Sequence, residues 1–282
     1  MKNIVKFVGF NRNIEFNVVL SIAKDIKKIK LMASISNNEI KKVKSLQQKK
    51  FRDEYGLFTV EGEKMVEEAL HSRFKVENIY RRDEIGEEAM KRISALTSPS
   101  PVLAVLRKPS DVYVDDSSSF AESLPSKGLY LGLDTIRDPG NLGTILRIAD
   151  WFGIDAVFAA KDTVDVFNPK VVQATMGAIF RVKLHYVDLP ALSERVLESG
   201  GRIYGTFLDG RNMYERNLDT GCECPVMIVI GNESEGISED MSKLVSDRLY
   251  IPPYPAGDPG SESLNAAIAT AVTVAEFRRR TY

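Results

Sequence analysis

The chain has 282 residues, 44% of them hydrophobic and 27% charged, an ordinary balance for a soluble globular protein. A chain of this length tends to divide its core, so we expect two domains. Cys222 and Cys224 are too few for a disulfide framework, and no stretch approaches the ~20 apolar residues that span a membrane. These features exclude a disulfide-rich secreted scaffold and a membrane-spanning protein, and we expect a cytoplasmic location.

The net charge of −1 is unevenly distributed along the chain. Residues 1–110 contain 22 Lys and Arg against 14 Asp and Glu, whereas residues 111–282 contain 16 against 25. This asymmetry suggests that any polyanionic partner binds the first part. A solvated helical surface explains the same charges, because lysine and arginine are also good helix formers.

The first part of the chain predicts a small α/β domain over residues 32–108. Residues 1–31 do not share the pattern of this domain, and we interpret them as a disordered extension or a start-site artefact before Met32. A basic amphipathic helix over Asn38–Lys50 is predicted to open the domain. Strands are then predicted at Leu57–Val60, Val76–Tyr80 and Val102–Leu106. Helices are predicted between them, at Glu63–His71 and Glu87–Leu96. Residues 109–127 are rich in Ser, Asp and Pro, which is typical of a linker.

The second part, residues 128–282, predicts a larger α/β domain with a parallel sheet covered on both faces. The expected strands are Leu129–Leu133, Ala156–Ala160, Lys183–Val187, Ile203–Leu208, Val226–Ile230 and Leu249–Ile251. The expected helices are Asn141–Phe152, a helix that begins at Asn168-Pro169, Ala191–Glu198 and Leu264–Arg280.

Three segments rich in polar residues, Gly and Pro directly follow predicted strands: Asp134–Arg147, Gly231–Ser238 and Ile251–Asn265. Ligands bind beyond the carboxyl ends of the strands in open parallel sheets, so these segments are the candidate site. No dinucleotide-binding or P-loop glycine pattern occurs. The two histidines lie far apart, and the Cys222-x-Cys224 pair has neither a second pair nor a nearby histidine, which argues against a metal site or a catalytic triad.

Together and in this order, the segments resemble the three motifs of the SpoU (TrmH) family of RNA 2′-O-ribose methyltransferases in the SPOUT superfamily. The resemblance covers Leu129 to Arg280, and residues 32–108 are similar to the family's substrate-binding domain. The matching positions are Asn141, Gly143 and Arg147 in the first motif, Gly231, Asn232, Glu233, Gly236 and Ile237 in the second, and Ile251, Pro252, Ser263, Leu264 and Asn265 in the third.

This resemblance implies a trefoil-knotted parallel-sheet methyltransferase domain, an amino-terminal RNA-binding domain and S-adenosylmethionine as the methyl donor. The implied donor-binding residues are Thr206, Leu208, Gly210, Gly231, Asn232, Gly236, Ile251, Pro252, Ser263 and Leu264. The implied catalytic residues are Arg147, Asn141, Glu233, Ser263 and Asn265. Each glycine taken alone is more typical of an ordinary turn than of a binding site.

Arg147 is the residue that activates the ribose hydroxyl, according to the resemblance. Arginine is effectively always protonated, so we prefer a role in holding a phosphate and stabilising the developing oxyanion, with proton abstraction left open. We expect Asn141 to cap its helix and to orient Arg147. The candidate RNA contacts are Lys49, Lys50, Arg52, Arg137 and Arg147. Arg181 is a further candidate phosphate contact, and a surface salt bridge is an equally good interpretation of both Arg137 and Arg181.

The family also implies a homodimer joined through the first-motif region and the carboxyl-terminal helix, where small residues such as Ala271 and Ala275 allow close approach. An added amino-terminal domain favours 23S ribosomal RNA as the substrate. Three alternatives stay open from the sequence: methylation of transfer RNA, a non-catalytic RNA-binding or ribosome-assembly protein, and a small-molecule enzyme.

Overall fold

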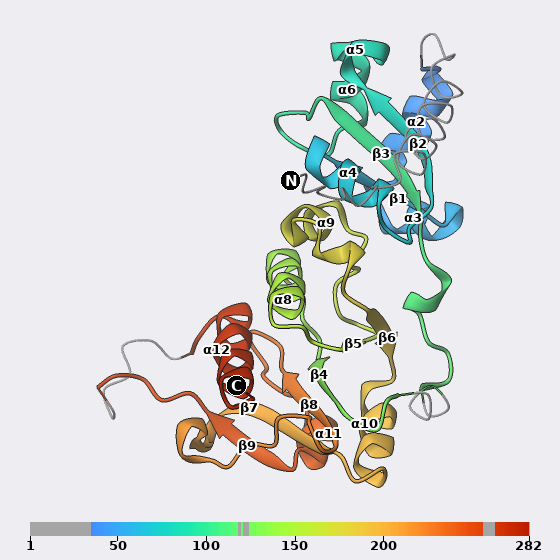
Figure 1. The fold of residues 1–282 in the computed structure, drawn as a ribbon. Helices are drawn as coiled ribbons and strands as arrows, with labels where there is room; N and C mark the ends of the chain where they lie inside the picture. Colours follow the sequence, from blue (N-terminus) through green and yellow to red (C-terminus); the bar gives the residue numbers. More distant parts are fainter. Residues whose placement is uncertain (1–34, 118–119, 121–123, 256–262, 282) are drawn as a thin grey trace, which may run out of the picture.

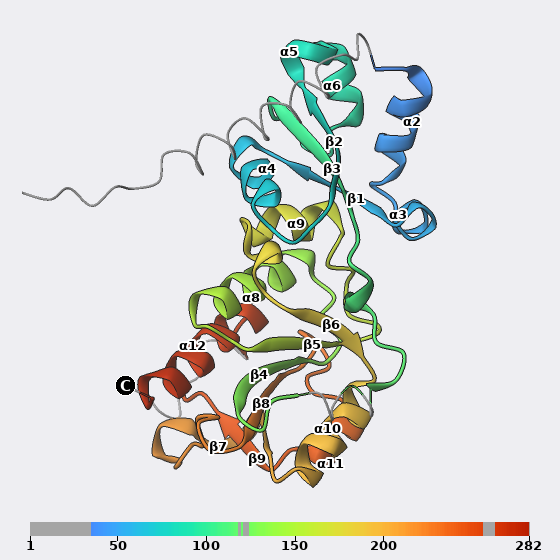
Figure 2. The ribbon, with the colours of Figure 1, turned by 45° about the vertical axis from the view of Figure 1, so that its right-hand side comes forward.

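The computed structural model describes residues 35–117, 120, 124–255 and 263–281, so the predicted leader 1–31 lies outside the described residues. Within these ranges there are two β-sheets, one of three strands and one of six. They lie at opposite ends of the molecule in Figures 1 and 2, with helix α9 between them. None of the helices in the described ranges has the length and apolar character needed to cross a bilayer.

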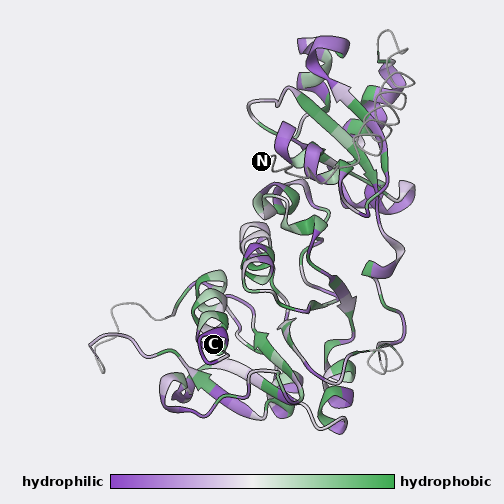
Figure 3. Ribbon diagram, in the orientation of Figure 1, coloured by the Kyte–Doolittle hydropathy of each residue, from purple (hydrophilic) through white to green (hydrophobic). Residues whose placement is uncertain are grey.

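The small sheet is antiparallel, with strand order β1-β3-β2, and it carries its helices at the edges and on its faces. Its central strand β3 is buried and hydrophobic along most of its length, as its green colour in Figure 3 shows, and it ends at the exposed Arg107. The elements in chain order are α2 (Asn37–Ser45), α3 (Lys49–Tyr55), β1 (Leu57–Glu61), α4 (Glu63–Leu70), β2 (Val76–Arg81), α5 (Arg82–Ile85), α6 (Glu87–Ile93) and β3 (Val102–Arg107).

The single helix predicted over Asn38–Lys50 is wrong, because the chain turns after Ser45 and begins α3 at Lys49. The turn lets Leu46 join Ile40 and Val43 in the core beneath the sheet. It also points the side chain of Arg52 into the interior, where the guanidinium donates to the carbonyl oxygens of the turn itself.

The large sheet is parallel throughout, with strand order β6-β5-β4-β8-β7-β9, as the alternation of strands and helices predicts. Its strands are β4 (Gly128–Leu133), β5 (Ala156–Ala160), β6 (Leu184–Val187), β7 (Arg202–Asn212), β8 (Pro225–Ile230) and β9 (Asp247–Tyr250). Every residue of β8 is buried, which explains its continuous apolar sequence.

Helices cover both faces of this sheet. One face packs against α8 (Pro139–Trp151) and α12 (Ala266–Arg279), and the other against α10 (Leu189–Glu198) and α11 (Glu239–Leu244), while α9 (Pro169–Thr175) packs on α8 and on β1 of the small sheet. The short α11 was absent from the sequence prediction. Single-turn 3-10 helices lie at Ser110–Val112 (η1), Ala178–Phe180 (η2) and Met213–Glu215 (η3). The segment interpreted as a linker packs onto the sheet, where Tyr113 forms an isolated bridge with Tyr186.

The two sheets share a continuous core instead of being joined by a flexible tether. Phe58 of β1 packs on Phe167 with ring centroids 4.7 Å apart, and Phe74 packs edge-on against Phe180 at 5.3 Å. Arg52 forms an ion pair of 2.6 Å with Asp165, and both side chains are almost completely buried. The relative orientation of the two parts is therefore set by specific packing and a buried charge pair.

Candidate active site at the carboxyl ends of the strands

A chain of side-chain hydrogen bonds joins the three predicted motifs. Asn141 on α8 donates from Nδ2 to Glu233 Oε1 at 2.8 Å, and its Oδ1 accepts from Asn265 Nδ2 at 2.9 Å. Asn265 is also the N-cap of α12, since its Oδ1 accepts from the backbone N–H groups of Ala267 and Ile268. A carboxamide both donates and accepts, so the nearly buried Asn141 can connect a carboxylate on one side to an amide on the other.

The predicted N-cap role of Asn141 is wrong. The cap of α8 is Asp138, whose Oδ1 accepts from the Asn141 backbone N–H at 2.8 Å, with Pro139 at the first helical position. The Asn141 side chain is therefore free to bond across to the other motifs.

Arg147 does not contact Asn141, contrary to the expected orienting interaction. It lies six residues further along α8, which is roughly 9 Å along the axis and about 240° around the helix. Its side chain is exposed and forms no hydrogen bond or ion pair within the part of the chain that the structure describes. The structure thus brings Asn141, Glu233 and Asn265 together and leaves Arg147 apart from them.

Asn232 organises the loop of the second motif. This buried side chain donates to the carbonyl oxygen of Thr135 at 2.8 Å and accepts from the N–H groups of Ser234 and Glu235. Thr135 has a φ of 63°, an uncommon conformation for a β-branched residue, and its hydroxyl donates to Asp162. The loops after β4 and β8 are therefore bonded to one another before any ligand arrives.

Asp134 opens the first candidate segment, and its role in joining two loops was not predicted from the sequence. It is buried at the end of β4, and its Oδ2 accepts from the backbone N–H of Ser238 at 2.7 Å, at the N-cap of α11. The available signal was an aspartate directly after a buried apolar strand, a position where an unpartnered carboxylate is costly.

Two glycines of the predicted donor site are required by close backbone approach. A Cβ on Gly231 would lie 2.2 Å from the carbonyl carbon of Gly236, and one on Gly210 would lie 2.6 Å from that of Leu249. Gly236 has a φ of 73°, which favours glycine. Gly143 has a different reason, because its Cβ would lie 2.4 Å from Ala174 where α8 packs on α9.

Strand β7 departs from its partner next to these glycines. Thr206 and Arg211 both pair with Leu249 of β9, so the four residues between them bulge out of the ladder. Arg248 holds this bulge: its guanidinium lies 3.5 Å from the ring centroid of Phe207, and it forms an ion pair with Asp209. Within the bulge Leu208 is 69% exposed, an apolar side chain displayed at the carboxyl end of the sheet.

The remaining predicted donor-site residues come from the third motif. Ile251 and Pro252 are half-buried directly after β9, and Ser263 and Leu264 are exposed just before α12. Residues 256–262 between them lie outside the described ranges.

The structure corrects one predicted RNA contact and locates the others. Arg52 is 2% exposed and binds Asp165 through two nitrogens, so its charge is neutralised in the interior. Lys49 and Lys50 are exposed on α3, the first paired with Asp53 and the second 5.8 Å from the ring centroid of Phe51.

Arg137 is exposed and lies 3.7 Å from a Glu235 oxygen. Arg181 is occupied by the carboxylates of Asp150 and Glu68, whose hydrogen bonds raise its pKa, Asp150 contributing more. This confirms the salt-bridge interpretation of Arg181.

Comparison with known proteins relates both halves of the chain to RNA-modifying proteins. Residues 128–275 match the SpoU rRNA Methylase family, and residues 37–107 match the MRM3-like substrate binding domain. The chain is 30% identical over 265 residues to the 23S rRNA (guanosine(2553)-2′-O)-methyltransferase RlmP of Bacillus subtilis, covering 89% of this chain and 100% of that protein. It is 27% identical over 297 residues to human mitochondrial rRNA methyltransferase 3, covering 82% of this chain and 69% of that protein.

Solved structures show the same relationship. A TrmH-family protein from Porphyromonas gingivalis is 38% identical with a TM-score of 0.74, covering 88% of this chain and 100% of that one. An AdoMet-bound rRNA methyltransferase from Sinorhizobium meliloti is 28% identical with a TM-score of 0.77, covering 89% of this chain and 98% of that one.

Proposed function

The chain belongs to the SpoU rRNA methylase family, and we propose that it methylates a ribose 2′-oxygen of 23S ribosomal RNA. It is an RNA methyltransferase that uses S-adenosylmethionine as donor. The 23S assignment draws on similarity to RlmP, which spans that whole protein, and on the match of residues 37–107 to a substrate-binding domain.

The residues at the strand ends fit the donor. The close backbone approaches at Gly231 and Gly210 bring the backbones of neighbouring loop segments together at this edge, and exposed Leu208 offers an apolar surface for a purine ring. When bound there, the donor supplies an electrophilic methyl group on a positively charged sulfur. We propose that it is held by Thr206, Leu208, Gly210, Gly231, Asn232, Gly236, Ile251, Pro252, Ser263 and Leu264.

The hydrogen-bonded chain from Glu233 through Asn141 to Asn265 is the observation that carries the proposed active site. It ties the loop after β8 and the start of α12 to the first turn of α8. A site assembled in advance does not spend binding energy on ordering its loops, so its groups act fully on the reacting atoms. We propose that Glu233, Asn141 and Asn265 set this geometry and that Ser263 helps to place the ribose.

Arg147 supplies the charge in this mechanism. Because its guanidinium has no carboxylate partner among the described residues, it is available to bind an RNA phosphate and to stabilise the oxyanion that develops on the 2′-oxygen. When bound, the donor would supply the methyl group that the 2′-oxygen receives, and the hydroxyl proton would pass to solvent. Fixing the ribose in one orientation is the positional part of the rate enhancement that these residues would contribute.

The test is Arg147→Ala, with Arg202→Ala as the matched control. Arg202 is also an exposed arginine but lies at the amino end of β7, away from the motif loops. We expect Arg147→Ala to lower single-turnover methylation of 23S RNA fragments about 10²–10³-fold. Calorimetric donor binding should persist, and the free energy of unfolding should change by less than about 0.5 kcal/mol. Full turnover by Arg147→Ala would refute the assigned role.

We further propose a homodimer. Trp151 at the end of α8 is 85% exposed and Ile268 of α12 is 51% exposed, and exposed apolar side chains on these neighbouring helices suit an interface. Ala266 and Ala267, in contrast, pack within the chain's own core. Light scattering should give a mass of twice the 31.5 kDa chain, and the Trp151→Glu variant should have the mass of a single chain.

A trefoil knot formed by the segments around the second and third motifs is proposed from family membership. We also retain the proposed division at residues 32–108, 109–127 and 128–282 and the proposed cytoplasmic location.

A further inference from the structure

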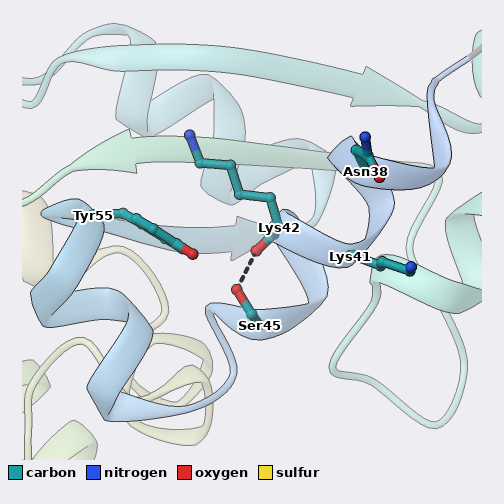
Figure 4. Close-up of a pocket in the computed structure, with 5 residues that line it drawn as sticks. All are labelled: Asn38, Lys41, Lys42, Ser45 and Tyr55. Carbon is teal, nitrogen blue, oxygen red and sulfur yellow. Dashed lines mark hydrogen bonds between the residues drawn. The ribbon is translucent and has the colours of Figure 1, made fainter.

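A surface pocket of about 480 Å³ lies between α2 and α3 in the small domain, distant in sequence from the methyltransferase motifs. It is lined by Asn38, Lys41, Lys42, Ser45 and Tyr55 (Figure 4). The four α2 residues follow an i, i+3, i+4, i+7 spacing and therefore share one helical face. The core stripe of α2, with Ile40 and Val43, is buried, so the pocket lies on the face turned away from the core.

The two lysines of this pocket carry uncompensated charge. Lys41 and Lys42 are exposed and form no ion pair among the described residues. Many other cations of the domain are neutralised by carboxylates: Lys49 and Lys108 by Asp53, Lys75 and Arg107 by Glu77, Arg73 by Asp111, and Arg52 by Asp165. Ion pairs thus neutralise part of the positive charge of the small domain, whereas the charges of Lys41 and Lys42 at the pocket stay available to bind an anion.

An aromatic surface adjoins these charges. Tyr55 is half-buried, and Lys42 Nζ lies 5.2 Å from its ring centroid. Phe51 stacks beside Tyr55 with centroids 6.1 Å apart and an interplanar angle of 22°. In Figure 4, Lys42 leans toward the ring, whereas Lys41 extends to another side of the pocket.

Asn38 completes the set with an exposed carboxamide that makes no hydrogen bond within the described residues. A free amide can pair with a base edge, which offers both donors and acceptors. Proteins that bind single strands combine cations along the backbone with aromatic rings on which bases stack, whereas a duplex keeps its bases stacked inside.

We propose that this pocket binds an unpaired nucleotide of the RNA substrate. The base stacks on the ring of Tyr55, Asn38 bonds its edge, and Lys41 and Lys42 hold the flanking phosphates as Lys42 moves from the ring to the phosphate. The proposal rests on the proposed function, since it assumes an RNA substrate. It assigns to α2 the RNA contact that the sequence had placed on Arg52.

The experiment measures fluorescence anisotropy with a labelled mixed-sequence single-stranded RNA of about 20 nucleotides and with the blunt duplex of the same sequence. The full chain is compared with Tyr55→Leu, Tyr55→Phe and the double variant Lys41→Ala/Lys42→Ala. The matched control is Lys44→Ala, which removes an exposed lysine from the same helix outside the pocket.

We expect Tyr55→Leu to weaken single-strand binding about fivefold or more and Tyr55→Phe to preserve it, because stacking needs the ring and not the hydroxyl. Loss of two phosphate contacts should reduce the slope of log affinity against log salt by about 1.4. Lys44→Ala should stay within about twofold of the unmodified chain. Thermal melts verify folding, and photo-crosslinking of 4-thiouridine RNA to the unmodified chain should label the peptide containing Tyr55.

A Lys44→Ala effect as large as that of the double variant would overturn the proposal in favour of diffuse electrostatic attraction. So would an unchanged affinity of Tyr55→Leu, or duplex binding that equals single-strand binding. Donor binding and methylation are measured separately on the unmodified chain. Their absence would refute the proposed function, whereas loss of the pocket effect alone would refute only this inference.

Discussion

Replacing Asn141 with Asp tests whether the hydrogen-bonded chain assembles the active site. The substitution preserves size and keeps the oxygen that accepts from Asn265 Nδ2. It exchanges the Nδ2 donor, 2.8 Å from Glu233 Oε1, for a second carboxylate oxygen. One charge-assisted hydrogen bond thereby becomes a contact between two like charges.

The magnitude follows from these two changes. Loss of a hydrogen bond to a charged group costs about 1.5–3 kcal/mol. Repulsion between two partly exposed carboxylates adds about 1–2 kcal/mol, since the effective dielectric is high beside solvent. We therefore expect the assembled site to be disfavoured by about 3 kcal/mol, which appears as donor affinity reduced about 100-fold.

Calorimetric titration with S-adenosylhomocysteine measures this loss, and Glu233→Gln supplies the rescue. In the variant Asn141→Asp/Glu233→Gln, the Gln amide donates to the new carboxylate, so the same hydrogen bond forms in the opposite direction. We expect its donor affinity to return to within about tenfold of the unmodified chain. A double variant as weak as Asn141→Asp alone would refute the argument that this bond assembles the donor site.

Two further predictions concern stability. Arg52→Ala should lower the free energy of unfolding, measured with urea, by about 3–5 kcal/mol, because Asp165 then stays buried without its partner. The double variant Arg52→Met/Asp165→Asn should lose less stability, since it leaves no buried charge. Equal losses in the two variants would contradict the charge argument. Hydrogen bonds from Arg279, then Arg280, lower the pKa of Glu276 from 4.5 to about 2. The folded carboxylate therefore stabilises the protein above about pH 4.5, and this contribution disappears as pH falls toward 2. Glu276→Gln should be less stable than the unmodified chain by about 1–2 kcal/mol at pH 7, a modest loss because Arg279 is exposed and solvent screens the ion pair. This difference in stability should disappear in acid, and a difference independent of pH would contradict the prediction.

The parallel sheet could be predicted from the sequence because its strands are short apolar runs between helical patterns. The six predicted strands appear, and the start of α9 at Asn168-Pro169 is confirmed by the Asn168 side chain capping Lys170 N–H. The errors arose where periodicity carries no stop signal, as at the turn after Ser45. The cap of α8 is readable from the sequence, because Asp138-Pro139 is a stronger start signal than Asn141.

The hydrogen bonds of the site could not be predicted from physical pattern alone. Asn141 is 92 residues from Glu233 and 124 residues from Asn265, and no local rule connects positions so far apart. The order of motifs after strands indicated the sheet edge where they meet. Which side chains bond, and that Arg147 lies on another side of α8, depends on helix phase and loop geometry.

Arg52 shows why charge counts overestimate a nucleic-acid surface. Because Lys49, Lys50 and Arg52 are close in the sequence, charge counting assigns all three to one basic patch, although only the two lysines are exposed. Only tertiary structure reveals Asp165, 113 residues away, and the carbonyl oxygens of Leu46 and Gln47 that occupy the remaining donors. A cation satisfied in this way cannot also bind phosphate without leaving a buried carboxylate unpaired. Among the basic residues of α2 and α3, those without a carboxylate partner, including Lys41 and Lys42, are therefore the ones left to attract RNA.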